Sequence, residues 1–547
     1  MIKYLLTVSI LIACLTMSLS QNTVGLLTFD EDKTTPGYNL HYPNNQGNAY
    51  LLDNCGQIVH MWEENNFAPG NGIILDENGD LYMCKGRGRT SNPNFHAGGG
   101  GEKLEVRDWD NNLLWEFTIN NDTMRMHHDI TLNPNTDGVF IIVWEVIDID
   151  DAIAAGRDPS LLNGQTLWPD KIVEVEPDGN GGGTIVWEWR AWDHLIQDFD
   201  STKENFGDPS ANPGKIDVNI GPAQSDWMHG NSLDYNASLD QLLLSVPEFD
   251  EFWIIDHNLT TEEAAGPEGD LLFRWGSPIN YRAGTEDDQQ LFFQHDAHWL
   301  RVAEDHPDFG KIGVFNNQVG TDFSSVHILS PEFDASTGTY PMEQGRFLPE
   351  DFEWSYIRPI PQDLFSTGLS SIQRLSNGNT LITSGRMGYA FEITPEEEIV
   401  WEYVSPLRGG APVTQGTELT VNQNILFRFN RYETDYPAFV GRDLEPSGFL
   451  ELDPNPLENC AVTSTSNLLA EGLVNIYPNP TNDYIQIEFN SALIGSELKM
   501  MSLTGETIQK INIRDKTYVK VDANGMDNGI YFINIDGVFA GRIVVAN

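Results

Sequence analysis

A short strand that carries a tryptophan recurs six times along this chain, and no other feature limits the fold as strongly. Apolar residues precede each tryptophan, and a glutamate follows it in four of the six copies. The tryptophans are Trp62, Trp115, Trp187, Trp275, Trp354 and Trp401. After each copy the pattern predicts a loop, two strands joined by a polar turn, and a third strand. A small sheet cannot bury both of its faces alone, so we expect neighbouring units to pack on each other as propeller blades.

The turns inside these units are typical of β-hairpins. Asn-Gly at positions 78–79 and 377–378, and Asp-Gly at 137–138, each separate two apolar runs. These dipeptides adopt the positive φ that a tight turn between antiparallel strands needs. Four strands in each of six units predict an all-β, six-bladed β-propeller over residues 21–458, while the irregular spacing leaves a seven-bladed arrangement open. We expect the tryptophans to pack between blades.

The first twenty residues have the composition of a secretory signal peptide. Lys3 provides a positive charge, residues 4–17 form an apolar run, and small residues precede Gln21 as a cleavage site. Residues 11–14, Leu-Ile-Ala-Cys, also resemble a lipoprotein box. No later stretch is long and apolar enough to span a bilayer, so we expect no transmembrane segment after signal removal.

The chain is strongly acidic, with 81 Asp and Glu against 31 Lys and Arg and a formal net charge of −50. Such a surface repels nucleic-acid phosphates, so nucleic acid is not expected as a partner. It also repels anionic substrates, and any anion site must therefore be locally cationic. Three cysteines, Cys55, Cys84 and Cys460, follow the signal peptide. Their odd number implies no disulfide framework and leaves at least one thiol free or paired between chains.

Three histidine motifs occupy one phase of the repeat. They are Met126-His127-His128-Asp129, Met228-His229-Gly230-Asn231 and Gln294-His295-Asp296-Ala297-His298. The innermost strand of each blade lines the central channel of a propeller, so motifs from three blades should meet around one axis. An alignment without gaps makes His127, His229 and His295 equivalent, and a shift by one residue replaces His127 with His128. The sequence leaves both choices open.

Residues 40–450 resemble the arylsulfotransferase family of secreted bacterial enzymes. The resemblance rests on the three histidine motifs, on the run from 229–235 to 252–256, and on Phe315-Asn316-Asn317. It implies transfer of a sulfuryl group from a phenolic sulfate ester to a phenol acceptor, without a nucleotide sulfate donor and without a cofactor. The transiently sulfated histidine of the family lies in its Gln-His motif, which maps onto His295.

One position departs from the family. Pro247 stands where the family has an arginine, and Glu248 follows it, so an anion site has lost a cation and gained an acid nearby. Arg386, Arg282, Lys85 and Arg87 are candidate replacements. With His295 as nucleophile, we expect the substrate to be bound by His127, His128, His229, His298, Arg282 and Arg386. Asp129 or Asp296 is expected to orient an imidazole.

Two other functions stay open at this point. The missing arginine favours a non-catalytic cell-surface propeller that binds a sulfated glycan or a protein partner. Several channel imidazoles also suit a histidine-ligated metal hydrolase or lyase, because neutral imidazole is a common metal ligand.

Composition changes after the propeller. Residues 459–471 are predicted to be a linker, and residues 472–547 contain short alternating strands that predict a small β-sandwich. Tyr477-Pro478-Asn479-Pro480 and Gly529-Ile530-Tyr531-Phe532 resemble the type A sorting domain of the type IX secretion system. The resemblance implies the type IX machinery as a partner, a final location in the medium or at the outer cell surface, and no part in catalysis.

Overall fold

The computed structural model describes residues 22–64, 67–86, 92–460, 474–502, 507–514, 517–526, 528–535 and 538–546. The predicted signal peptide, most of the predicted linker and Arg87 lie outside these residues. The chain forms two compact units, Met1–Leu457 and Glu458–Asn547. Within the described part, no helix has the length and apolar character needed to cross a membrane. Cys84 is free and buried, and Cys55 and Cys460 are each disulfide-bonded.

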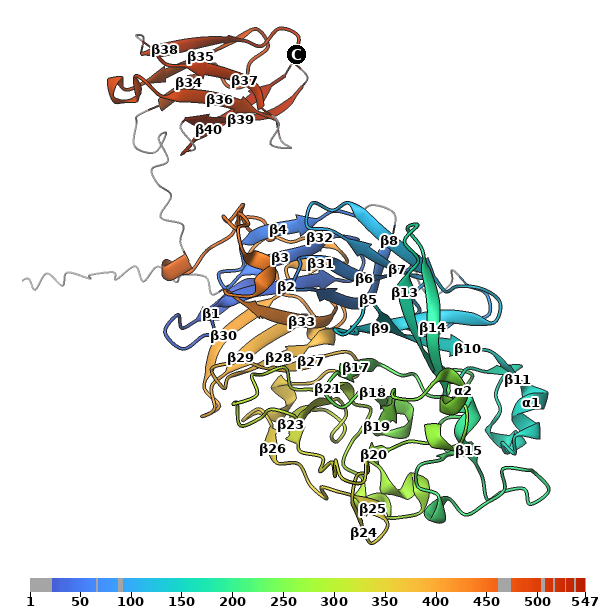
Figure 1. Cartoon of the computed structure of the whole chain (residues 1–547). Helices are drawn as coiled ribbons and strands as arrows, with labels where there is room; N and C mark the ends of the chain where they lie inside the picture. The colour runs from blue at the N-terminus through green and yellow to red at the C-terminus, as the bar shows by residue number, and fades with distance from the viewer. Residues whose placement is uncertain are drawn as a thin grey trace, which may run out of the picture. The chain divides into compact units, whose positions relative to one another are not determined.

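The described residues of the first unit contain six antiparallel sheets of four or five strands (Figure 1). From the inner strand outward, three of them are β33 (Leu426–Glu433), β2 (Gly37–Pro43), β3 (Ala49–Asp53), β4 (Ile58–Trp62); β5 (Ala68–Leu75), β6 (Leu81–Gly86), β7 (Lys103–Arg107), β8 (Leu113–Thr118); and β9 (Met124–Leu132), β10 (Val139–Glu145), β13 (Asp170–Pro177), β14 (Gly183–Arg190). The others are β17 (Ser232–Asn236), β18 (Gln241–Val246), β19 (Glu251–Asp256), β20 (Phe273–Trp275); β21 (His295–Trp299), β22 (Ile312–Asn316), β23 (Ser325–Leu329), β26 (Trp354–Tyr356); and β27 (Ser371–Arg374), β28 (Thr380–Ser384), β29 (Tyr389–Ile393), β30 (Ile399–Val404), β1 (Gly25–Phe29).

The connections between these strands contain short helices and short strand pairs. Two short helices are α1 (Ile149–Ala154) and α2 (Thr261–Ala264). Small strand pairs are β11 (Ile147–Asp148) with β12 (Thr166–Leu167), β15 (Leu195–Ile196) with β16 (Ile216–Asp217), β24 (Met342–Glu343) with β25 (Arg346–Phe347), and β31 (Leu407–Arg408) with β32 (Ala411–Pro412).

The predicted hairpins are present in the inner strands. β5 with β6, β9 with β10, and β27 with β28 are antiparallel neighbours across the three Gly-containing turns. Gly79 and Gly378 have φ angles of 88° and 87°, a region that glycine enters without steric cost. The second strands, such as β10 and β18, are buried along their whole length because neighbouring sheets cover both of their faces.

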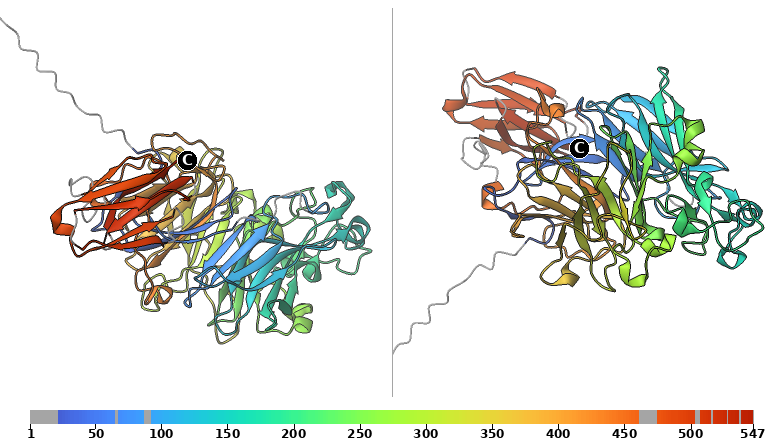
Figure 2. Two further views of the ribbon diagram at one scale, coloured as in Figure 1. Left: turned by 90° about the horizontal axis from the view of Figure 1, so that it is seen from above. Right: turned by 60° about the horizontal axis from the view of Figure 1, so that its bottom comes forward.

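The inner strands form a ring that the two ends of the unit complete. Contacts between sheets pass from β33 to β5, β9, β17, β21, β27 and back to β33. β33 pairs with β2, and β1 pairs with β30, so strands from the start and the end of the unit share two sheets. Figures 1 and 2 show blue N-terminal strands beside orange strands from late in the chain. The first unit is therefore the all-β, propeller-like domain that the repeat predicted.

The recurrent tryptophans lie on the outermost repeat strand of each sheet, and five of the six are buried. Four of them donate a hydrogen bond from Nε1 to a backbone carbonyl in the connection between the third strand and the outer strand of the next sheet. These bonds are Trp62 to Asp108 (3.2 Å), Trp187 to Leu259 (2.8 Å), Trp275 to Pro349 (2.6 Å) and Trp401 to Asn54 (2.8 Å). A buried indole satisfies its N–H in this way while its rings fill the space between sheets. The predicted packing of the tryptophans between blades is confirmed.

The second unit is the small β-sandwich that the sequence predicted. One sheet contains β34 (Val474–Tyr477), β35 (Tyr484–Phe489) and β38 (Tyr518–Asp522). The other contains β37 (Thr507–Asn512), β36 (Glu497–Met501), β39 (Gly529–Ile535) and β40 (Val538–Val545). Alternate residues such as Ile485 and Ile487 in one sheet, and Leu498 and Ile533 in the other, form a shared core.

Candidate functional site

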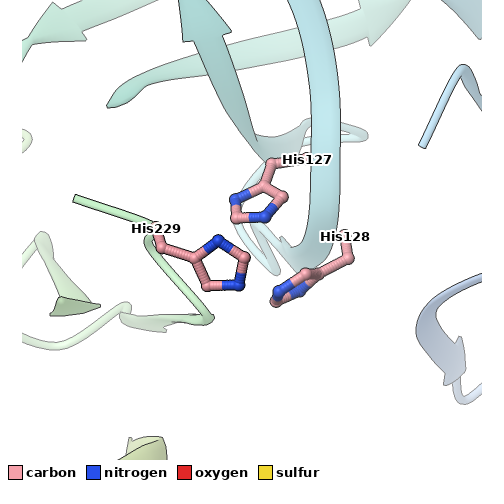
Figure 3. A group of neighbouring side chains, drawn as sticks. All are labelled: His127, His128 and His229. Carbon is pink, nitrogen blue, oxygen red and sulfur yellow. The ribbon is translucent and has the colours of Figure 1, made fainter. Parts of the chain in front are cut away.

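The histidine motifs meet because they lie on three neighbouring inner strands. His127 and His128 are on β9, His229 lies three residues before the start of β17, and His295 begins β21. One ring nitrogen from each of His127, His128 and His229 lies within 4.8 Å of the other two (Figure 3). Both members of the His127–His128 pair therefore belong to the cluster, which we call the imidazole cluster (His127, His128 and His229).

His295 is held as one defined tautomer by Asn317, which follows β22. The Asn317 amide nitrogen donates to the backbone oxygens of Ser366 (2.8 Å) and Leu369 (3.0 Å), so its Oδ1 faces His295 as an acceptor. His295 Nδ1 lies 2.9 Å from that oxygen and must carry the proton. Nε2 is therefore left with an unprotonated lone pair.

The surroundings of His295 keep its ring neutral. Burial, together with the neighbouring His229, lowers the pKa of His295 to about 3. Because this value lies far below 7, the imidazole is uncharged at physiological pH and its Nε2 keeps a free lone pair. A charge on His229 acts to lower the pKa of His295, and a charge on His295 acts to lower that of His128, so His295 lies near the imidazole cluster.

His229 has the opposite electrostatic character. Its Nδ1 lies 2.6 Å from Asp226 Oδ2, three residues earlier in the chain. Burial acts to lower the pKa of His229, but the carboxylates of Asp226, Asp170 and Glu248 outweigh it and the pKa is raised. The ring therefore holds a proton more readily than its neighbours, and Asp226 fixes that proton-carrying imidazole in place.

His127 and His128 are buried and are kept neutral by that burial, which lowers the pKa of each well below its usual value. His127 stacks on Trp144 with ring centres 3.9 Å apart. Within the described residues, no side chain hydrogen-bonds its ring nitrogens, Nδ1 lies 3.8 Å from a buried carboxylate oxygen of Asp170, and a hydrogen bond with the Gly230 backbone acts to raise its pKa.

A glycine borders the imidazole cluster, and its replacement has an expected cost. A Cβ on Gly99 would lie 2.1 Å from His128 Cδ2 and 3.0 Å from His127 Nε2, and the residue has a φ of 75°. We expect Gly99→Ala to lower the free energy of unfolding by about 1–3 kcal/mol, from backbone strain and ring displacement. Gly98→Ala is the matched control, because its Cβ would meet nothing within 4 Å. Denaturant unfolding of the two variants compares them, and equal stability would contradict this packing.

Arg386 is the sequence-predicted cation that the structure brings to His295. Gly368 lies between them, since a Cβ there would be 3.5 Å from Arg386 Nη2 and 3.6 Å from His295 Cε1. Arg386 Nη1 contacts Asn422 at 3.3 Å, whereas its buried Nε finds no hydrogen-bond partner, and its guanidinium no carboxylate, among the residues that the structure describes. Such a guanidinium beside a neutral imidazole is suited to hold an anion.

The other candidate cations are already neutralised. Arg282 makes ion pairs with Asp198 and Asp217, at 3.1 and 2.6 Å, so it offers little charge to a ligand. Lys85 is buried and faces Glu64 at 4.0 Å. His298, also predicted to bind substrate, is hydrogen-bonded through Nδ1 to the backbone oxygen of its neighbour Asp296.

Three aspartates, on β9, β17 and β21, each link their inner strand to the following sheet. Each accepts a hydrogen bond from a backbone N–H of the following sheet: Asp129 from Leu233 (2.9 Å), Asp234 from Trp299 (2.9 Å) and Asp296 from Ile372 (3.0 Å). Asp129 and Asp296 also bind Arg428 of β33. His295 is oriented by Asn317 and by neither of these aspartates, whereas a carboxylate oxygen of Asp296 lies 3.5 Å from Nδ1 of His298.

Pro247 and Glu248 lie in a short 3-10 turn, Pro247–Phe249, directly after β18. Burial raises the pKa of Glu248 to about 7, against the lowering influence of His229. Gln224 Nε2 donates to its Oε1 at 3.0 Å. Where the family has an arginine, this chain therefore has the carboxyl group of Glu248 near the imidazole cluster.

Sequence reasoning missed Asn317, Asp226, Asp170 and Arg428. Asn317 stands in a motif that carried the family resemblance, and Asp226 precedes His229 by three residues, so local signals existed for both. Asp170 and Arg428 reach the site from other strands, and no local pattern marks them.

Comparison with known proteins decides the family. The family model for arylsulfotransferase (ASST) matches residues 29–405. This protein belongs to the arylsulfotransferase family. A second model, for a secretion system C-terminal sorting domain, matches residues 475–540. The arylsulfotransferase-like domain is therefore joined to a type IX sorting domain, which indicates secretion or an outer-surface location.

Solved structures resemble this arylsulfotransferase-family chain only distantly. A protein of unknown function from Bacteroides caccae is 10% identical, with a TM-score of 0.38 over 73% of this chain and 99% of the other. A periplasmic gluconolactonase from Pseudomonas aeruginosa is 11% identical, with a TM-score of 0.33 over 72% and 98%. A β-propeller domain from Myceliophteria thermophila is 11% identical, with a TM-score of 0.32 over 66% and 81%. No curated protein matches the chain.

Proposed function

We propose that this protein transfers a sulfuryl group from a phenolic sulfate ester to a phenol through a sulfohistidine at His295, without a nucleotide donor. The observation that carries the proposal is the fixed tautomer of His295. Its Nδ1 proton is donated to Asn317, and burial keeps the ring neutral, so the Nε2 lone pair is free to attack. The proximity of His229 and Arg386 to His295 supports a role for Arg386 and the imidazole cluster in holding the sulfuryl oxygens.

The first half-reaction forms the sulfohistidine. The Nε2 lone pair of His295 attacks sulfur, the S–N bond forms, and the bond from sulfur to the phenolic oxygen breaks. Its electron pair leaves on that oxygen, to which protonated His229 donates a proton. Asp226 stabilises the His229 imidazolium before the transfer and keeps its second nitrogen oriented afterwards.

The second half-reaction reverses these roles. The acceptor phenol gives its proton to neutral His229, and its oxygen attacks sulfur. The S–N bond breaks and its electron pair returns to Nε2 of His295. Because one product leaves before the acceptor enters, the kinetics are expected to be ping-pong.

The test is direct detection of the intermediate. The full chain is incubated with 4-nitrophenyl sulfate, with and without phenol, and nitrophenol release is followed. Without phenol, we expect a burst of at most one nitrophenol per chain and a sulfuryl adduct that peptide mass spectrometry at alkaline pH assigns to His295. Added phenol should give steady turnover and remove the adduct. Turnover with no adduct on His295, or with the adduct elsewhere, would refute the mechanism, and silence would favour a binding propeller.

Arg386→Ala is expected to raise the KM for the aryl sulfate by about 10- to 100-fold, because a charge-assisted contact to an anion contributes about 1.5–3 kcal/mol. Arg282→Ala is the matched control, since Asp198 and Asp217 neutralise that guanidinium. Initial rates at varied donor concentration measure both variants. An unchanged KM for Arg386→Ala would remove this residue from the anion site.

A further inference from the structure

We propose that Phe293 binds the aromatic ring of the donor and of the acceptor beside His295, and that Asp250 is the positioning residue that holds it there. The catalytic part of this inference rests on the proposed function. Phe293 stands two residues before His295, and the centres of the two rings are 6.0 Å apart with their planes inclined by 50°. Interacting aromatic rings have centres about 4.5–7 Å apart. An aryl group on a sulfur atom next to His295 is therefore within reach of the Phe293 ring.

Phe293 differs in exposure from two other aromatic residues at the site. Trp144 stacks on His127 and Phe427 packs against His128, with ring centres 3.9 and 4.9 Å apart, and both of these aromatic side chains are buried. Phe293 is partly exposed. A ligand that covers the open part of its ring removes apolar surface from water, which favours an aromatic or apolar group.

The backbone of Phe293 is strained. Its φ angle is 54°, a left-handed conformation that bulky residues rarely adopt, because Cβ then approaches the following carbonyl oxygen. Such strain persists only where the surrounding structure enforces it, and it is concentrated at binding and catalytic sites. Glycine would adopt this conformation without steric cost. A phenylalanine here, with a ring that is only partly buried, therefore points to a use for the ring other than packing.

Hydrogen bonds to two sheets hold the loop that carries Phe293. The Phe293 N–H donates to Asp250 Oδ1 at 2.7 Å, and the N–H of Phe292 donates to Asn316 Oδ1 at 2.7 Å. Asp250 lies between β18 and β19, and Asn316 ends β22. Gln289 donates from Nε2 to the other carboxylate oxygen of Asp250 at 2.9 Å. Because the loop is already fixed, a ligand does not have to order it, and that saving favours binding.

The turn that lacks the family's arginine is the one that ends in Asp250. The Asp250 N–H donates to the Pro247 carbonyl oxygen at 3.0 Å, and Asp250 itself has a φ of 53°, which aspartate adopts more readily than most residues. With one cation fewer at the sulfuryl group, contact with the ring is expected to supply a larger share of the binding energy of the donor. Phe293 is thus expected to set the preference of the site for aromatic substrates.

The first experiment measures the two halves of the substrate separately and without turnover. The full chain is titrated with phenol, which has the ring but no sulfuryl group, and with inorganic sulfate, which has the charge but no ring. Phe293→Leu keeps an apolar side chain and should weaken phenol binding by about fivefold or more, while the affinity for sulfate stays unchanged. Arg386→Ala should weaken sulfate binding and leave phenol binding unchanged. Equal weakening of both ligands by Phe293→Leu, or no binding of phenol by the unchanged chain, would overturn the aryl-binding role of Phe293.

Phe293→Gly separates a binding role from a packing role. Glycine removes the strain at this position, so we expect the denaturant midpoint of unfolding to be no lower than that of the unchanged chain, while phenol binding weakens as in Phe293→Leu. Phe309→Ala is the matched control, because this phenylalanine is 49% exposed in the connection between β21 and β22. Its affinity for phenol should be unchanged. A lower unfolding midpoint for Phe293→Gly, together with weaker binding of both ligands, would show that the ring only fills space.

Asp250 is tested by rescue. Asp250→Ala removes the acceptor of the Phe293 N–H and should weaken phenol binding, whereas Asp250→Asn keeps an oxygen that can accept this hydrogen bond and should retain the affinity. Equal loss in both variants would remove the positioning role of Asp250.

Activity separates this inference from the proposed function. Phe293→Leu is expected to raise the KM for 4-nitrophenyl sulfate by about fivefold or more, while the adduct on His295 still forms. An adduct that forms with an unchanged KM would overturn the aryl-binding role of Phe293 and leave the sulfohistidine mechanism standing. Phenol binding that depends on Phe293, in a chain that forms no adduct, would confirm the aryl site and refute the proposed function.

Discussion

His295→Ala is expected to lower kcat for 4-nitrophenyl sulfate by about 10³-fold or more, because the variant has no atom that can accept the sulfuryl group. The remaining imidazoles and Arg386 still bind the donor, so the KM should change much less than kcat. Stopped assays with phenol as acceptor measure both constants. The burst of nitrophenol without phenol should disappear at the same time.

The control for this prediction is His327→Ala. His327 is a buried histidine of the same sheet, and burial lowers its pKa to about 3, like that of His295. Its ring nitrogens bind Ser325 and Ser355 at 2.6 and 2.7 Å, away from the inner strand. We expect its folded fraction to keep the kcat of the unchanged chain. If both variants lose kcat equally while remaining folded, His295 has no special role.

Arg428→Ala is expected to lower the free energy of unfolding by about 3–5 kcal/mol, the usual cost of removing one partner from a buried ion pair. Arg428 Nη1 and Nη2 each lie 2.7 Å from a carboxylate oxygen of Asp129, and Nε lies 2.6 Å from Asp296. The guanidinium thus joins the closing strand β33 to β9 and β21, neither of which is its neighbour in the ring. Its loss leaves two buried carboxylates without their cation. Chemical denaturation followed by tryptophan fluorescence measures the change.

Arg301→Ala tests whether the effect is specific to the buried centre. Arg301 lies 2.7 Å from Asp234 but is 62% exposed, so water can replace it and the expected loss is below about 1 kcal/mol. Asp234 also keeps its hydrogen bond from Trp299. Similar losses in both arginine variants would show that Arg428 does not act as a central clamp.

Local patterns explain why much of the fold was predictable. The tryptophan strands, the Asn-Gly and Asp-Gly turns and the alternating strands of the second unit depend on neighbours within about ten residues, and each formed as expected. The same regularity placed His127, His229 and His295 at one phase of the repeat. Residues at one phase of stacked units lie at one level of the structure, so the sequence could predict that these motifs meet.

Local patterns did not predict which groups orient the histidines of the site. Asn317, and not an aspartate, holds the proton of His295, because the register between β21 and β22 brings these two side chains together. Asp170 reaches His127 from the third strand of the same sheet. The sequence offered Arg282 and Arg386 as equivalent candidates for binding the anion. Only the positions of the surrounding carboxylates show that Arg282 is neutralised and Arg386 is not.

The sequence by itself determined the all-β repeat, the sorting domain, the family and the histidines that gather at the centre, because all of these are written in short motifs or in a fixed period. The tertiary structure decided which strands close the ring, which groups hold each imidazole and which cations remain available to a ligand. These features depend on pairings between residues hundreds of positions apart, such as β33 with β2 and Arg428 with Asp129. No local pattern encodes such pairings, since they exist only after the sheets have packed.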